Sequence, residues 1–373
     1  MDYLTHTAQT LGSFALVLGI LVSIHELGHY AAARWCKVKI EAFSIGFGPA
    51  LKSWTDRHGT VWKLCALPLG GYVKMHGMGG EEDQGETEAE TAEEFHPHLA
   101  FTHKKVWQRA VIAAAGPAAN FVLAVVLFTA LQFSLGTNVP LAYVGDVRPG
   151  TAAAEAGLLK GDQILAVDGT KVDNFLDLQH IIGGEAGQVV TLSLRRDNKD
   201  ITATVHVRGE GVFFKTGRLG VASNPDHAVL ISRSLPEALV GGASQTWALV
   251  VATFAGLVGL ITTGDGAGDL GGPIAIAHLS GQVAQLGLAS LVNFIAMLSV
   301  NLGLLNLLPI PILDGGHLLF LGAEALRGRP VPARAQEYGY RLGMAIIATV
   351  FIFVSVNDLA RYGAFSWMRH LTG

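Results

Sequence analysis

Long apolar runs dominate the hydrophobic pattern of this chain. A helix needs about 20 mostly apolar residues to cross the hydrocarbon core of a bilayer. Four stretches meet this requirement: 11–33, 108–133, 289–325, which prolines interrupt, and 339–357. The pattern therefore predicts a polytopic α-helical membrane protein with about four transmembrane helices.

A fifth apolar run, 246–264, is ambiguous, and the lysines and arginines guide its interpretation. Ten of these cations lie within residues 34–109, and a second cluster lies between the last two spans, at Arg327, Arg329, Arg334 and Arg341. Cytoplasmic loops carry an excess of Lys and Arg. Four spans put both clusters in the cytoplasm, with both chain ends outside it, whereas a fifth span would move the second cluster out. We expect 246–264 to lie at the interface or on the bundle, and a true span is the alternative.

Residues 138–225 show a different pattern, in which short β-type runs alternate with Gly and Asp turns. The run 163–169 reads as a strand that ends in an Asp-Gly turn. Residues 174–182 have helical spacing, and 189–196 and 200–207 alternate apolar and polar side chains as a hairpin does. This segment is predicted to be a small β-rich domain with a helix, on the non-cytoplasmic side.

The loop between the first two spans contains two further features. "SIGFGP" (44–49) and "PLGGYVKM" (68–75) predict a hairpin or small sheet on the cytoplasmic face. The stretch 81–94 has eight acidic residues and no basic one, which indicates a solvated loop or a frayed helix. The alternative is that it gathers metal ions together with the nearby histidines, which are His96, His98 and His103.

Composition supports the membrane interpretation. Half of the residues are hydrophobic and 15% are charged, against about a quarter charged in soluble domains. The net charge of −4 offers no basic field to nucleic acid. Cys36 and Cys65 fit neither a metal knuckle nor a disulfide framework, so we interpret both as free thiols. The first apolar run lacks a basic flank and a small-residue cleavage site, which argues for a retained helix.

Three ionisable residues, His25, Glu26 and His29, lie inside the first span. Such groups are costly in a membrane and are usually functional there. Residues i and i+4 share one helix face, so the two histidines can bind one ion in the H-E-x-x-H arrangement of zinc proteases. Glu26 is then placed to act as a general base on a metal-bound water. The alternative is a helix in which two histidines have only structural partners.

A catalytic zinc site usually has three protein ligands and a water, so a third ligand is expected at membrane depth. Asp314 follows two prolines, Pro309 and Pro311, that break an apolar span, and a broken helix at this depth is tolerated where it lines a cavity. His317 is our second choice, and the more distant candidates are His278 and Glu324. Asp314 could instead be only a turn residue.

Taken together, these motifs resemble the site-2 protease family, and the bacterial RseP-type intramembrane metalloproteases in particular. The resemblance rests on H-E-x-x-H, on "N-x-x-P-x-P-x-L-D-G" from Asn306 to Gly315, on "AAGPAANF" (114–121), and on "PGTAAAEAGLLKGDQILAVDG", which resembles a PDZ domain. It implies that His25, His29 and Asp314 bind Zn²⁺ and that Glu26 is catalytic. It also implies substrate contacts, which are Asn301, Asn306, Pro309, Pro311, and a membrane-reentrant loop of Gly46, Phe47 and Gly48.

The resemblance implies an activity and a location. The activity is zinc-dependent intramembrane proteolysis of single-pass membrane proteins, such as anti-sigma factors or remnant signal peptides. The expected location is the bacterial inner membrane, with the PDZ domain on the periplasmic side, where it would bind a peptide or a substrate ectodomain by strand addition. Some relatives carry two tandem PDZ domains, whereas this chain has room for one, which leaves substrate gating open.

The predicted domains are 1–136 with the first two helices and the hairpin, 137–225 as the PDZ domain, 226–284 as the interfacial helix and connector, and 285–373 with the last two helices. Two other classes of protein compete with a protease. A metal transporter would spread polar groups along a path through several helices, and it has no use for a PDZ domain. A catalytically silent PDZ scaffold would leave Glu26 without a role.

Overall fold

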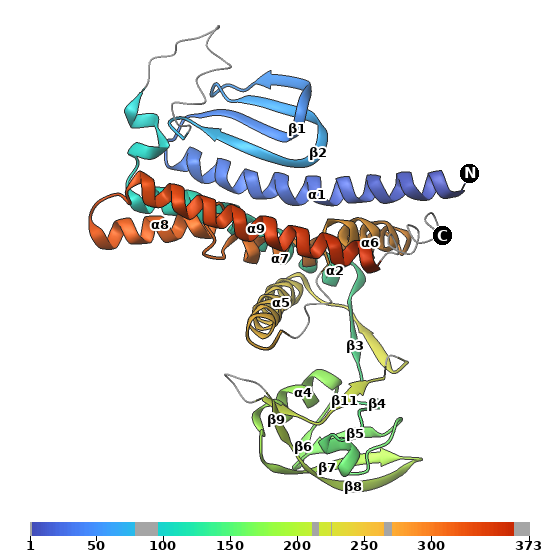
Figure 1. The fold of residues 1–373 in the computed structure, drawn as a ribbon. Coiled ribbons are helices and arrows are strands. Elements are labelled where there is room, and N and C mark those ends of the chain that lie inside the picture. The colour runs from blue at the N-terminus through green and yellow to red at the C-terminus, as the bar shows by residue number, and fades with distance from the viewer. Residues whose placement is uncertain (1, 79–95, 211–215, 225, 265–270, 362–373) are drawn as a thin grey trace, which may run out of the picture. The chain divides into compact units, whose positions relative to one another are not determined.

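The computed structural model describes residues 2–78, 96–210, 216–224, 226–264 and 271–361. The chain forms two compact units, one of residues 1–131 and 236–373 and the other of residues 132–235 (Figure 1). The acidic stretch 81–94 lies outside the described residues, so its predicted role is not addressed by the structure.

The first unit is mainly helical, as the apolar runs predict. Its helices are α1 (Asp2–Trp35), α2 (Val106–Leu135), α5 (Leu235–Thr263), α6 (Pro273–Gln285), α7 (Leu288–Asn306), α8 (Asp314–Arg327) and α9 (Ala333–Arg361). Two short 3₁₀ turns, Pro97–Leu99 and Phe101–His103, precede α2. Within the described residues, five helices are long and apolar enough to cross a membrane: α1, α2, α5, α7 and α9. The fold is therefore that of a polytopic membrane protein.

Helix α5 is the run that the sequence left ambiguous. It meets the length and composition of a span. In Figure 1, however, it is seen nearly end-on while α1 and α9 run across the view. Spanning helices tilt by only about 0–40° from the bilayer normal, so this direction favours a helix that lies along the membrane. Its interfacial position stays a prediction.

The predicted span 289–325 is broken, as its prolines indicate. Helix α7 ends at Asn306 and α8 begins at Asp314. The connecting loop folds closely on itself, because a Cβ at Gly315 would overlap the carbonyl groups of Leu307 and Leu308. It also touches α9, where a Cβ at Gly343 would overlap the Pro311 carbonyl. The loop is therefore fixed on both sides, which fixes the start of α8.

A β sheet covers α1. Strands β1 (Ile40–Thr55) and β2 (Val61–Met75) are antiparallel and so bent that residues 42–45 pair both with 61–64 and with 71–74. Gly46 and Gly48, with φ of 91° and 85°, lie where β1 bends. The order of pairing puts segment 71–75 at an edge of the sheet, and Figure 1 shows α1 between this sheet and the rest of the bundle.

Asp56 ties the far end of this sheet to α1. It lies in the β1–β2 turn, and its Oδ1 accepts hydrogen bonds from the backbone N–H groups of His58 and Thr60 at 2.8 and 3.0 Å. Its Oδ2 accepts from Trp62 Nε1 at 3.1 Å and from Tyr30 Oη at 3.2 Å. Since Tyr30 directly follows His29, the turn is anchored next to the candidate site.

The second unit is the predicted β-rich domain. Its sheet has the order β6-β5-β7-β8, and α4 packs beside it. The elements are β3 (Thr137–Pro140), β4 (Val144–Val147), α3 (Ala152–Glu155), β5 (Gln163–Val167), β6 (Thr170–Lys171), α4 (Phe175–Gly184), β7 (Val189–Arg196), β8 (Lys199–His206), β9 (Arg208–Glu210), β10 (Thr216–Arg218), β11 (Val221–Ser223) and β12 (Ala228–Ile231). Strand β12, which lies in the predicted connector 226–284, pairs with β3.

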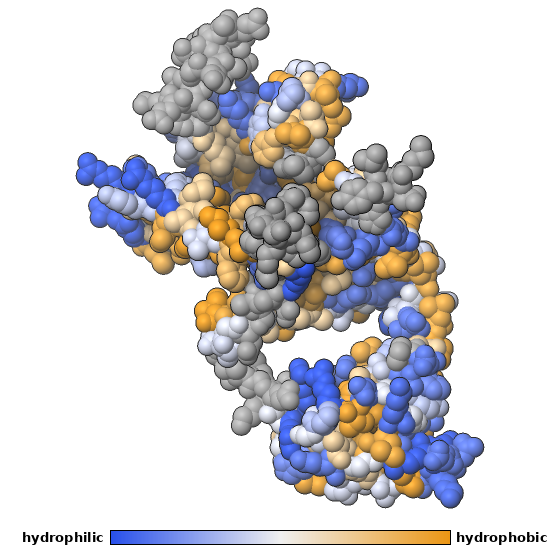
Figure 2. Space-filling model, turned by 45° about the vertical axis from the view of Figure 1, so that its right-hand side comes forward, coloured by the Kyte–Doolittle hydropathy of each residue, from blue (hydrophilic) through white to orange (hydrophobic). Residues whose placement is uncertain are grey.

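The cores of the two units differ. Buried aliphatic side chains from β4, β5, β7, β8 and α4 fill the β-rich unit, and the buried Asp162 pairs with Arg196 Nε at 2.7 Å. The helical unit instead has small core clusters and much outward-facing apolar surface (Figure 2), including Trp247 at 68% and Phe351 at 53% exposure. Large exposed apolar patches mark interaction surfaces, and here lipid is the natural contact.

Candidate metal centre

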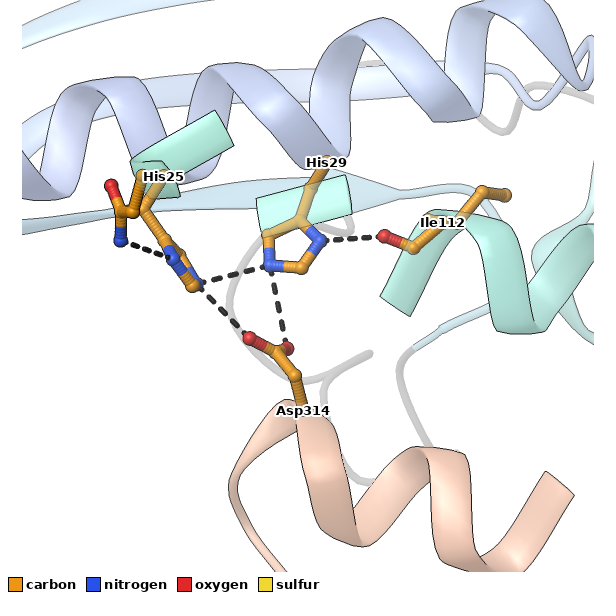
Figure 3. A network of polar contacts seen from close by, with 5 residues as sticks. His25, His29, Ile112 and Asp314 are labelled. Carbon is orange, nitrogen blue, oxygen red and sulfur yellow. Dashed lines mark hydrogen bonds and ion pairs between the residues drawn. The ribbon is translucent and has the colours of Figure 1, made fainter. Parts of the chain in front are cut away.

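Helix α1 presents His25 and His29 on one face, one turn apart, as the i, i+4 spacing requires. Their Nε2 atoms lie 3.2 Å from each other. The ring of His29 stands edge-on to that of His25, with the ring centres 4.8 Å apart (Figure 3). Both side chains are largely buried, with 9% and 12% of their surface exposed. Two imidazole nitrogens therefore face one small space inside the bundle.

Asp314 completes the cluster from the first residue of α8 (Figure 3). Its Oδ2 lies 3.1 Å from His25 Nε2, and its Oδ1 lies 3.4 Å from His29 Nε2. Two residues earlier in the loop, Ile312 has φ of 98°, which is a rare conformation for a β-branched residue. Such strain persists where the surroundings dictate it and is common at functional sites.

The cluster fits a metal ion of the zinc type. Ligand atoms about 2.0–2.2 Å from a tetrahedral zinc ion lie about 3.3–3.6 Å apart, and the three donor pairs here are 3.1, 3.2 and 3.4 Å apart. A Cβ at Gly116 of α2 would lie 2.8 Å from His25 Nε2 and closer still to His29 Nε2. Gly116 thus keeps the space beside both nitrogens open. Two imidazoles and one carboxylate also match a known catalytic zinc set.

Helix α2 holds both imidazoles from behind. Ile112 contributes its carbonyl oxygen, which accepts a hydrogen bond from His29 Nδ1 at 2.8 Å (Figure 3). Asn120 places its Nδ2 3.1 Å from His25 Nδ1, and its own carbonyl accepts from Ser299 Oγ of α7 at 2.8 Å. Ile112, Gly116 and Asn120 were not among the predicted site residues, although Gly116 and Asn120 lie in the stretch 114–121. Asn120 could have been suspected from the sequence, because a polar residue inside an apolar span is usually functional.

A cavity of about 670 Å³ surrounds the cluster within the helical unit. Glu26 lines it beside the two histidines and Asp314, as do Tyr72 and Val73 from the edge segment of β2. Glu26 is not one of the three residues whose donor atoms converge. It therefore remains available to act on a molecule bound at the cluster.

The structure separates the four candidates for the third ligand. Asp314 directs both carboxylate oxygens at the histidines. His317 lines the cavity one helical turn away, against the ring of Tyr340. The carboxylate of Glu324 pairs with Arg109 at 2.5 Å. His278 lies in α6 and is not among the described residues that line the cavity.

The residues expected to contact substrate lie in three places. Of the residues expected to contact substrate, Asn306 alone is among the described residues that line the cavity. Asn301 lies farther back on α7, where its Oδ1 accepts a hydrogen bond from Thr253 of α5 at 3.0 Å. The others are not among the described residues that line the cavity. Pro309 and Pro311 lie in the loop before Asp314, and Gly46, Phe47 and Gly48 lie at the bend of β1, where the ring of Phe47 stacks on the cavity residue Tyr72.

Comparison with known proteins gives concordant matches. The model of Peptidase family M50 matches residues 13–350. A protein of Rhizobium meliloti named "Putative zinc metalloprotease" is 40% identical over 368 residues, covering 95% of this chain and 98% of the relative. The metalloprotease MmpA of Caulobacter vibrioides is 37% identical, covering 97% and 98%. Among solved structures, the PDZ domain of an SdrC-like protein from Listeria monocytogenes matches at 21% identity and a TM-score of 0.21, covering 24% of this chain and 94% of that domain.

Proposed function

We propose that this chain, which belongs to peptidase family M50 and is a zinc metalloprotease, hydrolyses a peptide bond in or near the transmembrane segment of single-pass membrane proteins. The observation that carries the proposal is the position of the cluster. His25, His29 and Asp314 converge beside Glu26 in a cavity among helices that are apolar enough to cross a membrane. A substrate that reaches this cavity from the bilayer is itself a membrane segment.

In this proposal His25, His29 and Asp314 hold the zinc ion and Glu26 is the catalytic residue. When bound, zinc would supply Lewis-acid chemistry, making a water more acidic and a carbonyl more electrophilic. Glu26, which lines the cavity beside the cluster, would act as the general base that takes the proton of the attacking water and would pass it to the departing amine. Asp314 balances charge at the site, while α2 keeps the two imidazoles oriented through Ile112 and Asn120.

The substrate must lose its helical hydrogen bonds before its carbonyl groups can react. Segment 71–75 is an edge of the β1–β2 sheet, and Tyr72 and Val73 within it line the cavity. An extended peptide can pair with such an edge by strand addition. We infer that the unwound substrate lies against this edge, with the Asn306 carboxamide available to its backbone.

The substrates that we propose are anti-sigma-factor-like proteins and remnant signal peptides, in the bacterial inner membrane. The distribution of lysine and arginine supports a cytoplasmic position for the β1–β2 sheet and a periplasmic one for the β-rich unit. In the periplasm the β-rich unit, as a PDZ-like domain, would contact a peptide or ectodomain of the substrate.

The proposal is tested by Glu26→Gln. This change keeps the size of the side chain but removes its ability to accept the proton. Zinc content should remain that of the unaltered protein, because all three proposed ligands are intact. Cleavage of a single-pass substrate in membrane fractions should fall by about 10²–10⁴-fold, the usual contribution of a general base. Undiminished cleavage at normal zinc content would refute the mechanism.

A further inference from the structure

Most of the acidic, basic and histidine side chains that line the cavity are engaged by another part of the protein. Arg109 pairs with Glu324, and Glu26 accepts a hydrogen bond from the backbone N–H of Val73. His317 differs from them, because its imidazole forms no hydrogen bond or ion pair with any residue in the described part of the chain. Polar groups in protein interiors are normally paired, so the N–H of this half-buried ring is available to a bound molecule.

The position of His317 on α8 brings it close to the metal cluster. It follows Asp314 by three residues, and side chains at this spacing are neighbours on one helix face, with their Cβ atoms about 5–6 Å apart. Both residues line the same cavity, and His317 interacts electrostatically with Asp314 and with His29. It is nevertheless not one of the three residues whose donor atoms converge. His317 therefore lies beside the reaction centre without belonging to the ligand set.

Aromatic packing holds the ring of His317. The ring of Tyr340 on α9 lies against it, with the ring centres 5.9 Å apart and an angle of 53° between the planes. Tyr340 in turn meets Phe320 of α8 edge-on, with the centres 5.8 Å apart. These contacts restrict the imidazole through its ring and occupy neither nitrogen. The ring is thus supported while its N–H stays free to donate.

Glu26 and His317 line the cavity from different walls. Glu26 belongs to α1 and faces the β1–β2 sheet, where a Cβ at Gly71 would lie 3.5 Å from Glu26 Cγ. His317 belongs to α8 and faces α9. Figure 1 shows α1 between the sheet and the rest of the bundle, which includes α8 and α9. A carbonyl group attacked from the side of Glu26 can therefore direct its oxygen at a different group, and His317 is available there.

We propose that His317 is a further catalytic residue, which donates a hydrogen bond to the oxygen of the scissile carbonyl as negative charge develops on it. The inference deepens the proposed function and rests on it, because it takes peptide hydrolysis at this cavity as given. A neutral imidazole carries one N–H whichever nitrogen holds the proton, so donation requires no particular tautomer. Fixed donors aimed at developing charge are among the largest contributions to catalysis. No proton is transferred in this step, so Glu26 remains the group that moves the proton.

The test compares His317→Phe with His278→Phe in the purified, zinc-loaded, full-length protein. Phenylalanine keeps an aromatic ring against Tyr340 but has no N–H. His317→Phe should keep normal zinc content and a KM near that of the unaltered protein. Its kcat for a single-pass substrate should fall by about 10²–10³-fold, the usual effect of removing one such donor. His278→Phe is the matched control and should keep full activity, because His278 is exposed on α6 and is not among the described residues that line the cavity.

A second measurement distinguishes stabilisation of the developing charge from a structural role. A phosphinic peptide carries an anionic tetrahedral group that mimics the transition state, and its affinity is measured directly by calorimetry. Transition-state analogues gain from the interactions that accelerate the reaction, so this affinity should fall in His317→Phe by about the same factor as kcat/KM. The affinity for uncleaved substrate, measured with Glu26→Gln present in both proteins, should stay unchanged.

Unchanged kcat in His317→Phe would overturn the proposal. A fall in kcat with unchanged affinity for the phosphinic peptide would overturn it too, because the role would then be structural, and so would loss of zinc, because His317 would then be a ligand. If thermal unfolding shows that His317→Phe does not fold, His317→Leu, which also lacks the N–H, takes its place. Normal cleavage by Glu26→Gln would refute the proposed function itself, whereas normal cleavage by His317→Phe alone removes only this inference.

Discussion

Replacing Gly116 with alanine should disable the metal site while the rest of the bundle stays folded. The added methyl group would lie 2.8 Å from His25 Nε2 and 2.6 Å from His29 Cε1, and contacts under 3.0 Å are essentially never seen for a real Cβ. The rings cannot simply retreat. Both are hydrogen-bonded at Nδ1 to α2, the helix that carries the new methyl group.

The size of the effect follows from this crowding. An extra methyl group in a closely packed interior costs about 1–3 kcal/mol. The imidazoles can relieve it by moving away from the metal position, so the cost should fall on zinc binding. Since each 1.4 kcal/mol is a factor of ten, we expect zinc affinity to fall by about 5–150-fold. The loss is larger if the methyl group occupies the position of the ion itself.

Chelator competition on the purified protein measures this affinity, and thermal unfolding in detergent checks the fold. Gly12→Ala is a matched control, because Gly12 lies in α1 with nothing within 4 Å of its Cβ position. It should keep full zinc affinity and gain up to about 1 kcal/mol of helix stability. If Gly116→Ala binds zinc as tightly as Gly12→Ala, the space beside Gly116 is not the metal position and our reasoning fails.

Three further predictions follow from other parts of the molecule. Asp314→Ala should lose most of its zinc and His317→Ala should keep it, as metal analysis of both purified variants would establish; the reverse result would make His317 the third ligand. Burial alone would raise the pKa of Asp56, but hydrogen bonds from Trp62, Thr60, His58 and Tyr30 lower it to about 2. Because this folded-state pKa is below the unfolded value of about 3.9, the stabilisation is complete above pH 4 and is lost as the pH falls towards 2. After allowance for solvent screening it amounts to about 1 kcal/mol. Acid titration of tryptophan fluorescence should show a smaller loss of stability in Asp56→Asn, and identical titrations would contradict the assignment. Finally, cysteine reporters at Thr170 and Arg57 should be labelled from opposite sides of the membrane; labelling of both from one side would exclude the four-span topology.

Much of the fold could be predicted from the sequence because it depends on local pattern. The apolar runs gave the long helices, and the two prolines marked the break between α7 and α8. Turn chemistry located the strand ends in the β-rich unit: Asp168 and Gly169 have φ of 46° and 79°, as an Asp-Gly hairpin turn requires. These features depend on neighbours in the chain, which a single sequence displays.

The surroundings of the histidines could not be predicted in this way, and for α5 the hydropathy pattern alone left the direction open, so that its prediction rested on the distribution of lysine and arginine. Hydropathy measures whether a helix is apolar, and α5 is, but it does not give the angle between helices. Asn301 illustrates the same limit, because its hydrogen-bond partner Thr253 lies 48 positions away on α5. The partner of His25, Asn120, is 95 positions away. Such pairs depend on how helices pack, and no periodicity within one helix encodes that.

The close approach of α1 and α2 connects these observations. Lipid provides no hydrophobic force between helices, so close packing in a membrane depends on small residues. A Cβ at Gly28 would lie 2.8 Å from that of Ala119, which means that the two backbones meet there. This contact lies between the two points at which α2 holds an imidazole, Ile112 and Asn120. The small residues of α2 therefore do more than fill space. They bring polar groups near enough to orient two histidines, which the i, i+4 spacing places on one face but cannot orient by itself.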